Sequence, residues 1–198
     1  MDLKVFVKSY WEYYLELENQ FAETKRFVAF DKSNSGAFSV EYLKLFQAVC
    51  SEIDVVGKEI AAFANADFNA GYDTDIKKWG YEVQQLFPNL KDTHITFDDV
   101  YDFQPFKNWE YEIAVSKDGK KNLRRANKRD MIKWWKCYTD VKHQRIGLVT
   151  GTKNFNLANQ KNLITAFSAL YLLEQLFMGQ LGEDTSVIIE SSKIFKIV

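Results

Sequence analysis

SVEYLKLFQAVCSEIDVVGKEIAAFA, residues 39–64, carries the clearest structural signal in the chain. Its apolar side chains recur every three or four residues, which places them on one face of an α-helix. Ser39 is a candidate N-cap, because its hydroxyl can accept a hydrogen bond from a backbone N–H of the first turn. Gly57 stands inside the pattern at a cost of about 1 kcal/mol relative to alanine. We therefore expect another helix to approach this one closely at Gly57.

The same periodicity extends outward from this stretch in both directions. It predicts four more helices, at about residues 3–30, 73–87, 127–143 and 158–181, and Pro88 ends the second of them. The chain has 198 residues with only 2 Pro and 9 Gly, which is few for the many turns of a β-sandwich. The sequence therefore predicts a mainly α fold: an up-down helical bundle of about five helices in a single domain, residues 1–198.

The helical period is lost at about residues 88–125, where apolar and polar residues alternate. Lys117-Asp118-Gly119-Lys120 is a typical turn sequence between two such stretches. We expect this region to be an extended insertion that contains a small β-hairpin. The tail TSVIIESSKIFKIV, residues 185–198, is rich in β-branched residues, and we expect it to add an edge strand to that hairpin.

Composition excludes several classes of protein and suggests a location. With 46% hydrophobic and 27% charged residues, the chain is neither disordered, fibrous nor a disulfide scaffold. Cys50 and Cys137 stand far from any Cys-x-x-Cys spacing, which favours free thiols in a reducing compartment. The most apolar stretch, residues 163–178, is too short and too polar to span a bilayer. We expect a cytoplasmic protein with no membrane association.

Sequence motifs for common catalytic and cofactor sites are missing. His94 and His143 are the only histidines, and neither belongs to a metal-ligand spacing. There is no Gly-x-Ser-x-Gly, Walker A or Gly-x-Gly-x-x-Gly sequence. We interpret the acidic run Asp98, Asp99 and Asp102 as a solvated loop, with a metal role as the alternative. We therefore expect no metal and no cofactor.

Positive charge is concentrated in one segment. Residues 117–145 hold 11 of the 26 Lys and Arg residues but only 3 of the 27 Asp and Glu residues. Such a segment favours a local surface for polyanions; the alternative is a solvated face with a mobile loop. The candidate nucleic-acid-binding residues are Lys120, Lys121, Arg124, Arg125, Lys128, Arg129 and Lys133.

The most distinctive sequence combination is WWKCYTDVKHQR, residues 134–145, followed after a loop by NLITAFSALYLLEQLF, residues 162–177. It resembles HEPN-like proteins, which are all-helical nucleotide- and RNA-associated domains of bacterial defence and toxin systems. In that family a helix ends in a Tyr-x-x-Val/Ile-Lys-His-x-Arg-like segment, and a loop and an Ala- and Leu-rich final helix follow. The residues 51–63, SEIDVVGKEIAAF, are similar to the corresponding helix, whereas residues 88–125 are not explained by the resemblance.

The resemblance implies a dimer and, in active members, a metal-independent ribonuclease with an Arg-x4-6-His motif. There the histidine handles protons during attack by the ribose 2′-OH, and the arginine stabilises the phosphorane. In this sequence Arg145 follows His143 instead of preceding it. The candidate catalytic residues are His143, Arg145 and Lys142. The alternative is that His143 ends the helix while Lys142 and Arg145 complement its dipole.

Two functional hypotheses follow. The first is an RNA-binding or RNA-cleaving effector of a toxin or phage-defence system, with RNA or a nucleotide as its ligand. The second is a non-catalytic HEPN-like interaction module that binds a protein partner. Because residues 163–177 are apolar around most of the helix, we expect the helix to be central or to be covered in a homodimer. Trp134 and Trp135 are interpreted as core or interface residues, with base stacking as the alternative.

Overall fold

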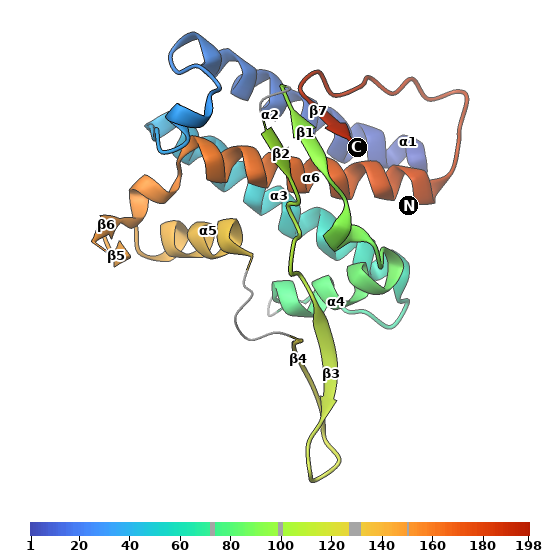
Figure 1. Cartoon of the computed structure of the whole chain (residues 1–198). Helices are drawn as coiled ribbons and strands as arrows, with labels where there is room; N and C mark the ends of the chain where they lie inside the picture. The colour runs from blue at the N-terminus through green and yellow to red at the C-terminus, as the bar shows by residue number, and fades with distance from the viewer. Residues whose placement is uncertain (72–73, 99–100, 127–131, 150) are drawn as a thin grey trace.

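The computed structural model describes residues 1–71, 74–98, 101–126, 132–149 and 151–198 (Figure 1). The α-helices in these residues are α1 Leu3–Phe6, α2 Glu12–Glu23, α3 Val40–Ala64, α4 Ile76–Leu86, α5 Lys133–His143 and α6 Gln160–Leu181. A π-helical turn, η1 Val7–Trp11, joins α1 to α2, and the 3-10 turns are η2 Thr24–Arg26, η3 Lys32–Asn34, η4 Leu90–Asp92 and η5 Asn154–Leu157. The expected start of the fourth helix, at Asn127, lies outside the described residues.

Side-chain caps fix where two of the predicted helices begin. The Ser39 hydroxyl accepts a hydrogen bond from the backbone N–H of Tyr42, so the expected N-cap of α3 is confirmed. The carboxylate of Asp75 accepts from the N–H groups of Lys77 and Lys78, so α4 begins at Ile76, three residues later than the sequence suggested.

Strands fill more of the chain than the sequence indicated. The strands in the described residues are β1 Ile95–Phe97, β2 Tyr101–Phe103, β3 Tyr111–Val115, β4 Lys121–Arg125, β5 Leu148–Val149, β6 Thr152–Lys153 and β7 Phe195–Ile197. They form an antiparallel sheet of order β2-β1-β7 and two separate hairpins, β3-β4 and β5-β6. The expected turn at residues 117–120 is confirmed: Gly119 has a φ of 79°, and the N–H of Ser116 donates to the carbonyl of Lys120.

The predicted up-down bundle of about five helices is therefore wrong, because the chain is a mixed α/β fold in which helices predominate. Ile95 and Phe97 of β1 are fully buried, so the region expected to be an insertion supplies part of the core. The tail strand also has a different partner from the one expected. β7 pairs with β1, in the register Ile95↔Ile197 and Phe97↔Phe195, and not with the β3-β4 hairpin.

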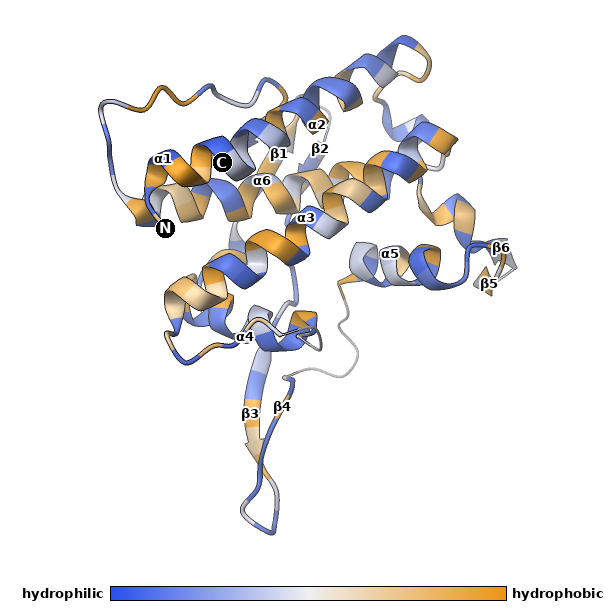
Figure 2. Cartoon of the chain, turned by 180° about the vertical axis from the view of Figure 1, so that it is seen from behind, coloured by the Kyte–Doolittle hydropathy of each residue, from blue (hydrophilic) through white to orange (hydrophobic). Residues whose placement is uncertain are grey.

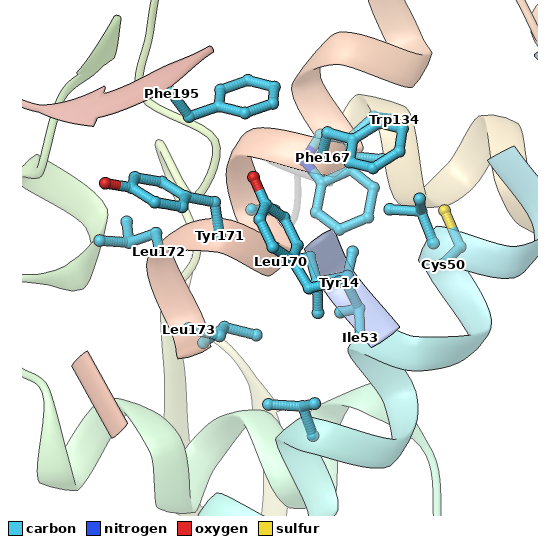
Figure 3. Close-up of a cluster of buried hydrophobic side chains, with 14 of the residues drawn as sticks. Tyr14, Cys50, Ile53, Trp134, Phe167, Leu170, Tyr171, Leu172, Leu173 and Phe195 are labelled. Atoms are coloured by element: carbon cyan, nitrogen blue, oxygen red, sulfur yellow. The ribbon is translucent and has the colours of Figure 1, made fainter. Parts of the chain in front are cut away.

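The core is built around α6, which crosses the middle of the molecule beside α3 (Figures 1 and 2). Figure 3 shows Tyr14 of α2, Phe167 and Tyr171 of α6 and Phe195 of β7 meeting in this core. Phe195 is 1% exposed and lies 5.1 Å from Phe97 between ring centroids. The wide apolar arc of α6 is thus covered by the chain's own elements. Within the described residues, no helix is both long and apolar enough to cross a membrane.

Helices α3 and α4 pack closely at Gly57. A Cβ atom built on Gly57 would lie 2.5 Å from Cε3 of Trp79 on α4, which is far inside normal contact. The indole N–H of the fully buried Trp79 donates to the Asp54 carboxylate at 2.9 Å, so the ring is held in place. The close approach expected at Gly57 is confirmed, and the missing side chain is what allows it.

The C-terminal tail is anchored to α2 by a buried carboxylate. Glu18, 1% exposed, accepts hydrogen bonds from the hydroxyls of Tyr14 and Ser192 and from the N–H of Lys193. The indole N–H of Trp11 also donates to the carbonyl of Glu190 at 2.7 Å. These contacts place β7 in register beside β1.

Candidate nucleic-acid interface

The β3-β4 hairpin projects away from the helical body (Figure 1). Its register places Ile113 opposite Leu123 and Val115 opposite Lys121 on one face, and Glu112 opposite Arg124 on the other. Ile113 is 46% and Val115 65% exposed. The hairpin therefore presents apolar side chains together with cations at its free end.

Some of these cations are already neutralised within the hairpin. The Arg124 guanidinium donates twice to one carboxylate oxygen of Glu112, at 2.8 and 2.9 Å, and Lys120 lies 3.4 Å from a carboxylate oxygen of Asp118. Lys117 and Lys121 are exposed and form no ion pair with any residue that the structure describes. The end of the hairpin thus holds uncompensated positive charge.

Of the other predicted nucleic-acid contacts, one lies at the base of the hairpin, one lies on α5, and two lie outside the described residues. Arg125 stands opposite Tyr111 at the base of the hairpin. Lys133 is the exposed first residue of α5. Lys128 and Arg129 lie in 127–131, outside the described residues. The hairpin cations Lys120, Lys121, Arg124 and Arg125 are therefore the predicted contacts that the structure brings together.

The predicted catalytic residues lie at the C-terminal end of α5. The helix ends at His143, whose exposed side chain has no hydrogen-bond or ion-pair partner among the described residues. The Arg145 guanidinium donates to the Gln47 side-chain oxygen at 3.1 Å, and the Lys142 ammonium lies 5.6 Å from the Tyr138 ring centroid. Burial is the main factor that raises the pKa of Tyr138 to about 12.

A neighbouring asparagine, rather than His143, satisfies the end of this helix. The buried Asn154 amide donates to the carbonyls of Gln144 at 2.8 Å and Asp140 at 3.3 Å. This hydrogen bonding fixes the direction in which the chain leaves α5.

Trp134, near the start of α5, is packed inward. It is 3% exposed and donates its indole N–H to the carbonyl of Pro105, so the interpretation of Trp134 as a core residue is confirmed.

The second histidine has a partner that sequence reasoning did not find. His94 Nδ1 lies 2.8 Å from a carboxylate oxygen of Asp102. Asp102 belongs to the acidic run that was interpreted as a solvated loop, but it lies on β2, diagonally across from His94 in the β1-β2 register. Asp102 is the middle residue of the three-residue strand β2, and its place near His94 follows from the β1-β2 register, which the sequence alone does not reveal.

One carboxyl group in the core has no partner. Glu174 of α6 is completely buried, and neither of its oxygens has a hydrogen-bond partner among the described residues. Burial raises the pKa of Glu174 well above its usual range, and Glu52 on α3 adds to the effect. A protonated Glu174 is thus the form that suits this environment.

No group of three or more His, Cys, Asp or Glu side chains within the described ranges is arranged to hold a metal ion.

Comparisons with protein-family models, with curated proteins and with solved structures give no significant match to this chain. The resemblance to HEPN-like proteins therefore stays a hypothesis that rests on the sequence.

Proposed function

We propose that this protein binds single-stranded RNA, with the β3-β4 hairpin as its contact surface. The observation that carries the proposal is the uncompensated charge of Lys117 and Lys121 at the end of a projecting hairpin. Lysine ammonium groups bind phosphate oxygens as point charges and release counterions from the nucleic acid. Exposed Ile113 and Val115 offer apolar contact to sugars and bases on the same face.

Fluorescence anisotropy with a labelled single-stranded RNA tests this proposal. We expect the variant Lys117→Ser/Lys120→Ser/Lys121→Ser to bind more weakly and to show a shallower salt dependence. Each lost contact to a single-strand phosphate lowers the log-log slope by about 0.7, so the two unpaired lysines give about 1.4 and all three give at most about 2.

A matched control removes the same charge elsewhere. Lys8, Lys44 and Lys193 are surface lysines that each pair with a carboxylate. Replacing all three with serine should leave the salt slope unchanged. Equal losses in both triple variants would show that only net charge matters, and the hairpin would no longer be the contact surface.

A metal-independent, HEPN-like ribonuclease at the end of α5 is the second candidate. This candidate is favoured because α5 ends at His143. In a continued helix the side chains of His143 and Arg145 would point apart, but Arg145 lies beyond the helix and is not held in that arrangement. In this chemistry His143 would accept the 2′-OH proton, while Arg145 and Lys142 would stabilise the charged phosphorane.

Cleavage of RNA in the presence of a chelator tests that candidate. His143→Ala and Arg145→Ala should each abolish cleavage, with melting temperatures close to that of the wild type. If the wild type cleaves none of several RNAs, the ribonuclease proposal fails. A non-catalytic HEPN-like module that binds a protein partner would then replace it, and either form fits a bacterial toxin or phage-defence system.

We also propose a homodimer and a cytoplasmic location. Ile146 and Leu148, 92% and 68% exposed beside Arg145, are apolar enough to be covered by a second copy, which would bring two His143 side chains together. Sedimentation of the wild type and of Ile146→Ser tests the dimer, and a monomeric wild type at micromolar concentration would contradict it.

The proposed cytoplasmic location rests on the cysteines: the free thiols of Cys50 and Cys137 suit a reducing compartment.

A further inference from the structure

A depression of about 560 Å³ lies beside the outer edge of β2. Three separate segments supply a lysine to it: Lys32 from η3, Lys107 from the loop after β2, and Lys161 from the first turn of α6. The backbone N–H of Lys161 donates to the carbonyl of Ser35, which ties two of these walls together. Segments far apart in sequence are thus held around one opening.

These lysines differ from others near the same sheet. Lys25 pairs with Asp98, and Lys91 pairs with Glu110. By contrast, Lys32, Lys107 and Lys161 form no ion pair with any carboxylate in the part of the chain that the structure describes. The carboxylate that lines the depression, Asp102, is already bonded to His94. The depression therefore carries excess positive charge with no internal partner.

The pair of His94 and Asp102 also lines this depression. A carboxylate oxygen only accepts hydrogen bonds, so the ring nitrogen that faces Asp102, Nδ1, is the donor of the 2.8 Å contact. Nε2 of the neutral ring is then an acceptor, which suits a ligand hydroxyl rather than a phosphate oxygen. The carbonyl of His94 accepts the N–H of Val198 at 3.1 Å, which fixes the backbone behind the ring.

An aromatic wall completes the depression. The rings of Tyr101 and Phe103 stack with centroids 5.3 Å apart and planes within 14°. Phe103 is half-buried, so part of its ring faces outward. Tyr101 is 8% exposed, and its buried hydroxyl has no hydrogen-bond partner among the described residues. The wall thus combines a stacking surface with an unsatisfied polar group.

We propose that this depression binds a nucleotide, with the phosphate held by Lys32, Lys107 and Lys161 and with the base against Phe103. Clustered lysines suit a phosphate, and aromatic faces accept any base. The volume lies within the range of small-ligand pockets. This site goes beyond the hairpin surface, because it needs none of the hairpin residues. A free mononucleotide and the phosphorylated end of an RNA strand share the required chemistry.

Isothermal titration calorimetry with AMP tests the site on the full chain. We expect saturable binding, weakened about tenfold or more by Lys107→Ser/Lys161→Ser, a loss equal to about 1.4 kcal/mol. Lys25→Ser is the matched control, since Lys25 is also exposed near this sheet but is paired and does not line the depression. Phe103→Leu should weaken binding of AMP and leave binding of inorganic phosphate unchanged.

The assignment would be overturned if AMP did not bind saturably, if adenosine bound as tightly as AMP, or if Lys25→Ser caused an equal loss. If Phe103→Leu left AMP binding unchanged, the nucleotide assignment would also fall. A 5′-phosphorylated tetranucleotide that binds more tightly than AMP identifies an RNA end as the ligand, and equal affinities identify a free nucleotide. AMP binding that persists in the hairpin triple variant separates this site from the proposed RNA surface.

Discussion

Replacing Gly57 with alanine tests whether the α3–α4 contact depends on the missing side chain. In an exposed helix this substitution stabilises by about 1 kcal/mol, because alanine loses less backbone entropy than glycine. Here the new methyl group would lie 2.5, 2.6 and 2.8 Å from three carbons of the Trp79 ring. We therefore expect the opposite sign.

The surroundings of Trp79 determine the size of the effect. Its ring cannot move aside easily, because it is fully buried, bonded to Asp54, and in edge contact with Trp109 and Trp135 at 5.5 and 6.2 Å. Forcing an extra methyl group into such a core costs about 1–3 kcal/mol. After subtracting the gain in helix propensity, we expect Gly57→Ala to destabilise by up to about 2 kcal/mol.

Urea unfolding followed by circular dichroism measures this free energy. Gly179→Ala is the control: Gly179 lies in the last turns of α6, and a Cβ there would meet nothing within 4 Å. That variant should be as stable as the wild type or slightly more stable. For a chain of this size, each kcal/mol moves the melting temperature by about 2–4 °C. A Gly57→Ala protein that is stabilised as much as Gly179→Ala would refute the packing argument.

Three further substitutions have defined outcomes. Burial raises the pKa of Glu174, so the contribution of this group to stability is complete below the ordinary Glu value of 4.5 and is lost as pH rises toward the folded-state value. The free energy of unfolding should fall by about 1.4 kcal/mol per pH unit in that window. Glu174→Gln should remove this dependence, and parallel unfolding curves for both proteins at pH 5 and pH 8 would contradict it. Glu18→Ala leaves the donors of Tyr14, Ser192 and Lys193 without their acceptor, so we expect a loss of about 2–4 kcal/mol and faster proteolysis in residues 182–194, whereas Glu18→Gln should retain part of the protection. Asn154→Ala frees two carbonyls at the end of α5 and should cost about 1–2 kcal/mol, with faster amide hydrogen exchange confined to that helix end; unchanged exchange would show that water replaces the amide fully.

Local signals in the sequence were sufficient where neighbouring residues determine the structure. The extent of α3, its Ser39 cap and the turn at Gly119 each depend on residues within a few positions of one another. Gly57 was also informative, because a glycine inside a strong helical pattern needs a packing reason.

The central sheet could not be predicted in the same way. The sequence indicated extended structure at residues 88–125 and in the tail, but it did not reveal the pairing: β1, β2 and β7 have three residues each, and β7 pairs with a strand about a hundred residues earlier. The same limit hid the depression beside β2. His94 and Asp102 meet through the register of β1 and β2, and the three lysines converge only after distant segments pack together.

The pairing of β7 with β1 also has a consequence for synthesis. Phe97 emerges from the ribosome long before Phe195, the residue that covers it in the folded protein. At about 5–20 residues per second, the intervening chain takes about 5–20 s to make. During that interval the free edge of β1 and the Phe97 ring face solvent or whatever apolar surface is nearby. A nascent chain of this protein should therefore recruit holding chaperones until β7 has left the ribosome, and ribosome profiling of chaperone-bound chains would show this binding begin once β1 has emerged.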